Sequence, residues 1–321
     1  GDAQNVAGVG SLCYQPTATR IRYTNVWTNT PPRGPQRGPG GVQSMTMLEP
    51  IIHKATKRLG LDHVDVHTMN APEGQALFGP PGRDGTRSNV SSAFAKEAIA
   101  KGAELFDWEG RKARSGQRNG SKVTGIGMCL SAYSAGASGV DGLFVIKPDG
   151  RMYIQSGVGN LGTGSTFDTM RAAAEGMDMP WDKCEVAWGN SALNLPWSAS
   201  QGGSSTTHAH TRANWAAVQD ATRKMKEIAA TALGGSADSY EVSGERVHRR
   251  GNRGQGLSFA QVAQRAIDLG GKDDGHELPE DINGMTTASA TALAGQGLMG
   301  VAKDNYPRDG ATYSFVAGFA E

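Results

Sequence analysis

The chain has 321 residues, 38% of them hydrophobic, and its formal net charge is only +1. This balance argues against a polybasic nucleic-acid or membrane-surface binder and against an acidic solvating tail. Three cysteines with no C-x-x-C spacing disfavour a disulfide framework and a cysteine-ligated metal site, and they favour a reducing, cytoplasmic compartment. No run of about 18 apolar residues is present, so we expect no membrane span.

The first third of the chain predicts one strand, two helices and a stiff loop. Residues 13–29 are rich in β-forming side chains and predict a strand, and a loop rich in proline, glycine and arginine follows over 30–43. The apolar pattern of 44–59 predicts a helix that Pro50 begins or kinks. A second helix is expected after Ser91 or Ser92, and then a polar connection over 107–122.

The rest of the chain predicts alternating strands and helices separated by glycine-rich turns. Residues 123–155 are strand material, and the Pro-Asp-Gly turn at 148–150 predicts an antiparallel hairpin. The further expected elements are a helix over 165–176, a strand over 184–188, a long helix from about 207 to Leu233, a hairpin over 240–250, a helix capped by Ser258 and a strand over 311–321. This pattern is typical of an α+β protein with mixed, largely antiparallel sheets flanked by helices.

The glycine loop at 157–164 reads GVGNLGTG and contains the spacing G-x-G-x-x-G. One interpretation is a dinucleotide-binding turn, in which glycines let the backbone approach a diphosphate at a helix N-terminus. That fingerprint requires a parallel βαβ unit, whereas the preceding strand is predicted to belong to a hairpin, which disfavours it. A glycine turn without any ligand is the plain alternative.

A further interpretation combines this loop with the second Gly/Ser/Thr loop at 198–207. Each loop carries hydroxyl groups and each is predicted to open a helix, so the two could converge on one extended anionic ligand. The histidines, by contrast, show no convincing metal-ligand spacing: His208 and His210 point apart on a helix, and His53, His63 and His67 have no evident partner.

Three segments in this order resemble the molybdenum-cofactor subunit of the xanthine oxidase/aldehyde oxidase family, the molybdenum hydroxylases. TNTPPRGPQRGPGGVQ (28–43) is similar to that family's arginine-glycine loop, with Arg37 and Gly38 at the matching positions. GVGNLGTG (157–164) resembles its pterin-contacting loop, and LPWSASQGGSSTTHAHTRA (195–213) resembles its later Gly/Ser/Thr loop and helix. The final YSFVAGFAE also matches a strand of the family, so the resemblance spans nearly the whole chain.

The resemblance implies a set of cofactor-binding residues. They are Arg37, Gly38, Leu161, Gly162, Thr163, Gly164, Gly203, Ser204, Ser205, Thr206 and Thr207. Pro39 stands where the family has an aromatic residue, and Tyr133, in the segment Met128–Ala135, is expected to line a substrate pocket with it. Leu161 and Thr163 replace the family's usual Met and Gln, so only backbone contacts to the pterin transfer at these positions.

The resemblance also implies the activity and the partners. We expect a molybdopterin enzyme, with the cofactor as its cytosine dinucleotide form, that hydroxylates an N-heterocycle, an aldehyde or an aromatic acyl compound with water as oxygen source. Electrons would leave through [2Fe–2S] centres and FAD on partner subunits. The cofactor's dithiolene holds the metal, so no protein metal ligand is expected in this chain.

Two features of the chain suggest a partial subunit. The amino-terminal GDAQNV does not begin with Met, which predicts a processed or internal piece of a longer polypeptide. The family's catalytic glutamate lies in a G-x-G-E loop that does not occur here, so we expect no catalytic residue in this chain and no activity without partner chains. On this basis residues 1–120 would belong to a first molybdopterin-binding domain and 121–321 to a second, incomplete one.

Two alternatives remain open at this point. The chain could be a nucleotide-dependent dehydrogenase that uses the G-x-G-x-x-G of residues 157–162, or a structural subunit that kept the fold without the chemistry. The cofactor content of the purified protein distinguishes them.

Overall fold

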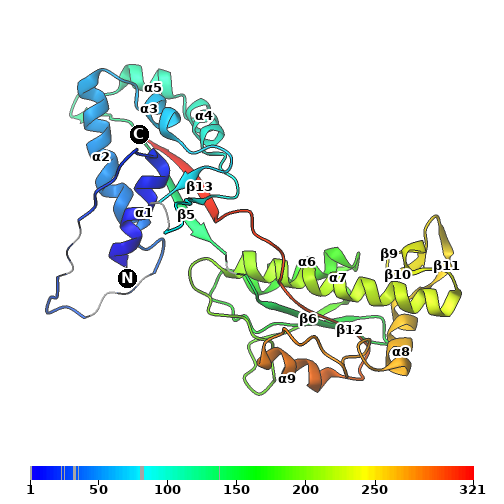
Figure 1. Ribbon diagram of the computed structural model, residues 1–321. Helices are drawn as coiled ribbons and strands as arrows, with labels where there is room; N and C mark the ends of the chain where they lie inside the picture. The colour runs from blue at the N-terminus through cyan, green and yellow to red at the C-terminus, as the bar shows by residue number, and fades with distance from the viewer. Residues whose placement is uncertain are drawn as a thin grey trace. The chain divides into compact units, whose positions relative to one another are not determined.

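A computed structural model describes the chain except Gly1, Tyr23, Asn25, Pro32, Arg33, Pro35, residues 80–82 and Ala137. The chain forms two compact units (Figure 1). Unit 1 comprises Gly1–Ala135 with Arg308–Glu321, and unit 2 comprises Gly136–Pro307.

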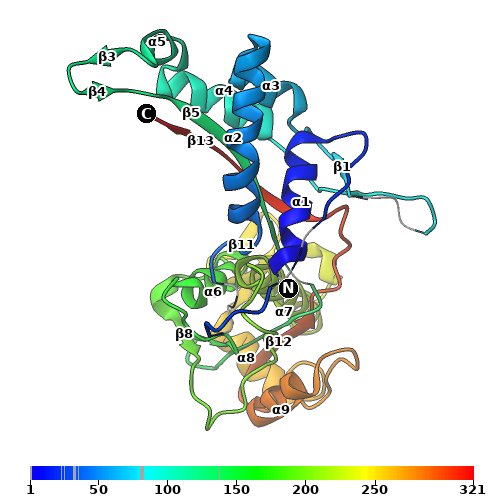
Figure 2. The same cartoon turned by 90° about the vertical axis from the view of Figure 1, so that its left-hand side faces the viewer.

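Unit 1 is built on a two-stranded antiparallel ribbon covered by helices. Strand β5 (Gly127–Ala135) pairs with β13 (Thr312–Ala320) along its whole length. Helices α1 and α2 lie side by side against β5 (Figures 1 and 2), while α4 packs against β13. The helices are α1 (Asp2–Tyr14), α2 (Gly41–Leu59), α3 (His63–Asn70), α4 (Ala95–Phe106) and α5 (Trp108–Arg114). Two short hairpins complete the unit: β1 (Leu77–Phe78) with β2 (Ser88–Asn89), and β3 (Arg118–Asn119) with β4 (Lys122–Val123).

The predicted strand over 13–29 is wrong. Helix α1 runs to Tyr14, and the described residues between it and position 29 form no strand. The reason is packing: Val9, Leu12 and Cys13 lie at helical spacing and are buried in one cluster with Met45 of α2. The polar connection over 107–122 likewise contains helix α5.

The predicted helix over 44–59 is confirmed, but Pro50 does not begin it. Helix α2 starts at Gly41, after Gly40, and includes Pro50 in its interior. The ribbon joins two distant parts of the chain in one compact unit, and the division into two cofactor-binding domains at residue 120 stays a prediction. Because β5 pairs with β13, residues 121–135 and the carboxyl-terminal strand both belong to unit 1.

Unit 2 is a four-stranded sheet with helices on both faces. The strand order is β12 (Leu298–Lys303), β6 (Asp141–Ile146), β7 (Met152–Gln155) and β8 (Cys184–Ala187). Alternate residues of β6 face opposite layers, so Phe144 and Ile146 pack in the cluster with α7 (Thr206–Leu233), whereas Leu143 and Val145 pack with α9 (Gly284–Leu293). The Pro-Asp-Gly hairpin is confirmed as the antiparallel pair β6–β7.

The glycine loop 157–164 lies inside a parallel crossover, although the strand before it belongs to a hairpin. Strand β7 pairs antiparallel with β6 on one side and parallel with β8 on the other. Helix α6 (Ser165–Gly176) connects β7 to β8. The expectation that no parallel βαβ unit surrounds this loop is therefore wrong, because the same strand takes part in both kinds of pairing.

A three-stranded antiparallel sheet and one helix pack against the carboxyl-terminal part of α7. The strands are β9 (Tyr240–Ser243), β10 (Arg246–Arg249) and β11 (Asn252–Ser258). Helix α8 (Phe259–Leu269) begins with the predicted cap, because Ser258 accepts a hydrogen bond from the amide of Gln261. The mixed α+β class with largely antiparallel sheets is confirmed.

Candidate functional site

The first glycine of the 157–164 loop is fixed by contact with the second loop. A Cβ atom on Gly157 would lie 2.0 Å from the backbone oxygen of Pro196, far inside van der Waals contact. The hydroxyl of Ser198 donates to the backbone oxygen of Gly157 at 3.1 Å. Gly157 therefore admits a neighbouring protein segment and not a diphosphate, which argues against a dinucleotide turn at this position.

Gln201 joins the two loops directly. Its side-chain Oε1 accepts from the amide of Gly159 at 3.0 Å, and its Nε2 donates to the backbone oxygen of the same residue at 2.8 Å. One side chain thus satisfies both backbone groups of a residue 42 positions away. The expectation that the two loops approach each other is confirmed, and Gln201 is the residue that the sequence analysis missed.

The helices opened by these loops run parallel. Near the start of both helices, the side-chain amide of Asn214 in α7 donates to the backbone oxygen of Thr169 in α6 at 2.9 Å. At the end of α6, Met177 meets Thr222, which lies farther along α7. Both N-termini therefore lie at the same end of the helix pair, where their dipoles add.

Neither helix start is capped by a side chain among the described residues. Gly164 precedes α6 and Ser205 precedes α7, and neither makes a side-chain capping hydrogen bond. Amides in the first turn of a helix lack intrahelical acceptors. Two adjacent sets of such amides form a site suited to an anionic ligand.

Left-handed backbone conformations shape the surface of both loops. Gly162 (φ +87°) and Gly203 (φ +62°) each leave open space where a Cβ would stand, with no described atom within 4 Å. Ser204 adopts φ +55° although it is not glycine. Glycine adopts this conformation readily, whereas Ser204 pays a free-energy cost for it that the surrounding loop must offset. The backbone at Gly162 and Gly203 can therefore be approached closely from the side where a Cβ would stand.

The hydroxyl groups expected to contact a ligand are partly used within the loops. The single proton of Ser205 Oγ is shared between the backbone oxygens of Gly202, at 2.9 Å, and Ser200, at 3.2 Å, and the Thr163 and Ser165 hydroxyls lie 2.9 Å apart. Leu161 is 67% exposed. The predicted residues Gly162, Gly164, Gly203, Ser204, Thr206 and Thr207 all lie in these two loops or in the first turn of α7.

A pocket of about 490 Å³ opens beside the joined loops. It is lined by Gly157, Gly159, residues 189–199 in part, and Met285 of α9. Its wall is anchored to the core, because the amide of Trp197 donates to the hydroxyl of Thr286, which in turn donates to the buried carboxylate of Asp141. The structure thus holds the 195–201 segment firmly against the sheet.

The other predicted site residues lie in unit 1. Arg37, Gly38 and Pro39 form the turn that leads into α2, where Arg37 is exposed and Gly38 has φ +54°. Tyr133 is half-buried in β5, directly opposite Ser314 of β13.

His210, for which the sequence indicates no metal-binding partner, is a buried side chain of α7. It is 5% exposed, and its Nε2 donates to the backbone oxygen of Ser198 at 3.0 Å. Because a carbonyl oxygen only accepts, this nitrogen carries the proton in the neutral ring. Burial lowers the pKa of His210, and the hydrogen bond to Ser198 partly opposes that shift.

Replacing His210 by glutamine should flatten the pH dependence of stability. Since the folded pKa of His210 lies below its unfolded value of about 6.5, its contribution is complete above that pH and is lost as the pH falls through the folded pKa. Denaturant unfolding of both proteins between pH 7.5 and 5 measures this. The wild type should lose stability more steeply than the variant, and equal slopes would contradict the prediction.

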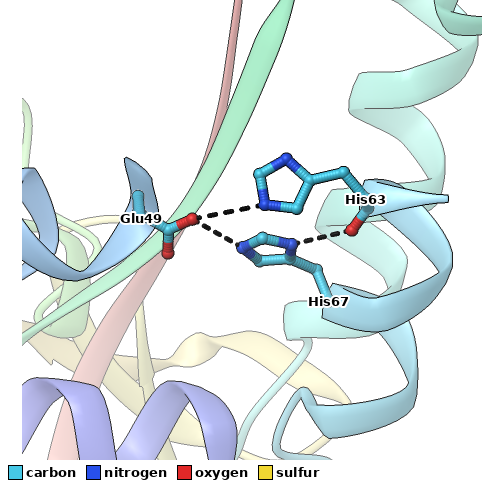
Figure 3. A group of neighbouring side chains, drawn as sticks. All are labelled: Glu49, His63 and His67. Carbon is cyan, nitrogen blue, oxygen red and sulfur yellow. Dashed lines mark hydrogen bonds and ion pairs between the residues drawn. The ribbon is translucent and has the colours of Figure 1, made fainter. Parts of the chain in front are cut away.

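Unit 1 contains a buried cluster that the sequence analysis did not identify. Glu49 of α2 meets His63 and His67 of α3, and Figure 3 shows the carboxylate directed at both rings. Burial, with the neighbouring rings of His67 and His53, lowers the pKa of His63 to about 4. The missed signal is the i, i+4 spacing of the two histidines, which places both on one helix face.

No described helix is both long enough and apolar enough to cross a membrane. Two models of a molybdopterin cofactor-binding domain match the chain, one over residues 3–71 and the other over residues 101–321. The second match alone covers more than half of the chain.

The chain is similar in sequence to molybdenum-binding subunits of Escherichia coli. The xanthine dehydrogenase molybdenum-binding subunit of strain O157:H7 is 28% identical over 182 residues, which is 54% of this chain and 23% of that protein. The aldehyde oxidoreductase molybdenum-binding subunit PaoC of strain K12 is 25% identical over 240 residues, 73% of this chain and 31% of its own. The chain therefore spans less than a third of the length of these relatives.

Solved structures share the fold. A Cu,Mo-CO dehydrogenase aligns with a TM-score of 0.65 and 18% identity, over 88% of this chain and 35% of that one. Quinoline 2-oxidoreductase from Pseudomonas putida 86 aligns with a TM-score of 0.61 and 16% identity, over 88% and 35%. These likenesses show the fold alone, and the match of the domain model over residues 101–321 shows that the chain belongs to the molybdopterin cofactor-binding domain family.

Proposed function

We propose that the adjoining starts of α6 and α7 bind the pterin dinucleotide of a molybdenum hydroxylase, and that the chain acts as part of such an oxidoreductase. The observation that carries this proposal is the Gln201 bridge between the two loops. It holds two parallel, uncapped helix N-termini together, and that arrangement suits the diphosphate of an extended anionic cofactor.

The loops offer backbone and hydroxyl groups to such a cofactor. Residues 161–164 and 203–207 would hold it, through the amides at the helix starts and the hydroxyls of Thr206 and Thr207. The open faces beside Gly162 and Gly203 fit the close approach of a pterin. When bound, the group supplies molybdenum redox chemistry for hydroxylation with water as oxygen source.

We assign supporting roles to the residues of unit 1. Arg37 and Gly38 would contact the cofactor, because an exposed guanidinium before a glycine turn suits bidentate binding of a phosphate or carbonyl group. Tyr133 and Pro39 would line a substrate pocket for an N-heterocycle, an aldehyde or an aromatic acyl compound. Their part is to orient the substrate and exclude water.

We place the remaining machinery on other polypeptide segments or chains. The carboxylate base would come from a G-x-G-E loop outside these 321 residues, and the [2Fe–2S] and FAD centres from partner subunits. The chain spans 23% of the xanthine dehydrogenase subunit it resembles, which is consistent with a contribution to a larger assembly. Three free cysteines fit a reducing, cytoplasmic setting.

Analysis of the purified complex tests the proposal. Molybdenum should be present at one atom per chain, with two organic phosphorus atoms for each molybdenum after the phosphorus of FAD is subtracted, and acid release should give cytidine monophosphate. Protein with neither molybdenum nor pterin, isolated from cells that make the cofactor, would contradict cofactor binding. Release of a different nucleotide would contradict only the prediction that the cofactor is the cytosine dinucleotide form.

Replacing Gln201 by alanine should weaken cofactor binding and lower the free energy of unfolding by about 1–2 kcal/mol. The change removes two partly buried hydrogen bonds, each worth about 1 kcal/mol. Molybdenum per chain and denaturant unfolding measure the two effects. Gln264→Ala, on the exposed face of α8, serves as the control and should change neither. Wild-type cofactor content in the Gln201 variant would remove the bridge from the proposed site.

A further inference from the structure

We propose that Glu49, His63 and His67 bind one divalent transition-metal ion in unit 1, with Zn²⁺ the best-suited ion. The proposal concerns a site separate from the cofactor loops of unit 2 and does not depend on the proposed function. It rests on the donor set, on the placement of the three side chains and on a mismatch of hydrogen-bond donors and acceptors.

The three ligand atoms converge from two helices. His63 and His67 project from the same face of α3 at i, i+4 spacing, and Glu49 faces them from α2 (Figure 3). One ligand atom from each lies within 4.8 Å of the other two. Glu49 Oε2 is 2.9 Å from His67 Nε2 and 3.7 Å from His63 Nε2. These separations bracket the value of about 3.4 Å expected between ligands of a tetrahedral zinc ion.

His67 presents a lone pair to the carboxylate. Its Nδ1 lies 2.8 Å from the backbone oxygen of His63, and because that oxygen only accepts, Nδ1 carries the proton. In the neutral ring Nε2 is then unprotonated, yet it faces Glu49 Oε2 at 2.9 Å. Two acceptors at this distance require a cation or an additional proton between them. An imidazole oriented by an Nδ1 bond to a backbone carbonyl is the usual arrangement of a metal-ligating histidine.

Tyr14 does not resolve the mismatch. Its hydroxyl lies 2.7 Å from Glu49 Oε1 and 2.9 Å from His67 Nε2, but it has a single proton to donate. If the hydroxyl donates its proton to Glu49 Oε1, His67 Nε2 has no donor. If it donates the proton to His67 Nε2, Glu49 Oε1 loses this donor. The phenol oxygen thus lies beside the proposed ion, where it or a water molecule could complete the coordination.

His63 supplies an independent observation. Its Nε2 is buried, has no hydrogen-bond partner among the described residues, and is directed at Glu49. The side chain is 4% exposed, so water does not readily satisfy the nitrogen. A buried polar atom without a partner costs about 1–3 kcal/mol, and a metal ion would remove that cost.

The donor set favours zinc. Two imidazoles and one carboxylate are typical ligands of Zn²⁺, whereas Mg²⁺ and Ca²⁺ prefer oxygen alone. A cavity of about 520 Å³ lies beside the cluster and is lined in part by His53 and His63. His53 Nδ1 lies 2.8 Å from His63 Nδ1, so a hydrogen bond between the two nitrogens can fix the orientation of the His63 ring. A bound ion would cross-link α2 to α3.

Metal titration of the untagged 321-residue chain tests the proposal. After chelator treatment and dialysis, the wild type should take up one equivalent of Zn²⁺ per chain, measured by elemental analysis. Co²⁺ in its place should give the visible absorption of a low-coordinate nitrogen and oxygen site. At a Zn²⁺ concentration about 100 times the dissociation constant, the melting temperature should rise by roughly 5 °C. A wild type that retains no zinc overturns the proposal without any variant.

Variants assign the ion to these residues. Glu49→Gln keeps the side-chain volume and removes the charge, and His63→Ala removes the unpartnered nitrogen. Each should weaken zinc binding by about 100-fold or more, since even outer residues of metal sites contribute 10–100-fold. His276→Ala, which removes an exposed histidine of unit 2, is the control and should bind zinc as the wild type does. Unchanged affinity in both cluster variants would overturn the assignment.

Discussion

Replacing Lys224 by alanine should lower the free energy of unfolding by about 3–5 kcal/mol, as expected when one partner of a buried ion pair is removed. Lys224 lies on α7 with a side chain that is 4% exposed. Its ammonium group is 2.6 Å from the Asp220 carboxylate and donates to the backbone oxygen of Met299 at 2.8 Å. The variant would remove the buried cation from Asp220 Oδ2 and leave the Met299 carbonyl without this donor at the contact between α7 and β12, and Asp220 would keep only the exposed Arg223 as its cation.

Arg223 provides a matched control on the same turn of the helix. It also pairs with Asp220, at 2.7 Å, but its side chain is 49% exposed. Exposed ion pairs contribute roughly 1 kcal/mol or less, so Arg223→Ala should have only a small effect. Denaturant unfolding of the two variants measures the difference. If the free energy of unfolding fell by a similar amount in both variants, burial would not determine how much the ion pair of Lys224 with Asp220 contributes to stability.

Much of unit 2 could be predicted from the sequence because its signals are local. The Pro-Asp-Gly turn at 148–150 fixes the β6–β7 hairpin, and Ser258 with Gln261 forms the cap of α8. Glycine loops mark the starts of α6 and α7. Each of these features depends on residues close together in the chain, which is the range over which turn and capping chemistry act.

The missed elements depend on distant partners. Helix α1 contains Gly8 and Gly10, which weaken its intrinsic preference, and it is held by burial of Leu12 and Cys13 against α2. Strand β12 is short and apolar, a pattern that a buried helix also shows. The parallel pairing of β7 with β8 arises only once α6 has crossed between them.

The candidate site shows the same division. Glycines and hydroxyls mark the two loops, but nothing near Gln201 in the sequence indicates that its side chain reaches Gly159. The distance from Glu49 to His67 is likewise set by how α2 and α3 pack. A side chain that joins two segments is defined by the fold that brings them together, and its residue type alone does not reveal the partner.

Gly157→Ala should disrupt the site more severely than any other single methyl group added to the loops. The new Cβ would stand 2.0 Å from the Pro196 backbone oxygen and 3.1 Å from Ser198 Cβ, so one of the two segments must move. Because backbone cannot yield as a flexible side chain does, we expect a loss of stability of about 3 kcal/mol. We also expect at least a tenfold fall in molybdenum content, because the shift separates Gln201 from Gly159.

Gly202→Ala is the control for this substitution. A Cβ at Gly202 meets no atom within 4 Å in the described structure, and its backbone lies outside the left-handed region. The added methyl group is therefore chemically identical but free of the clash. Thermal unfolding and molybdenum per chain should separate the two variants clearly. If Gly157→Ala kept the stability and cofactor content of Gly202→Ala, the close contact between the two loops could not be what holds the proposed site together.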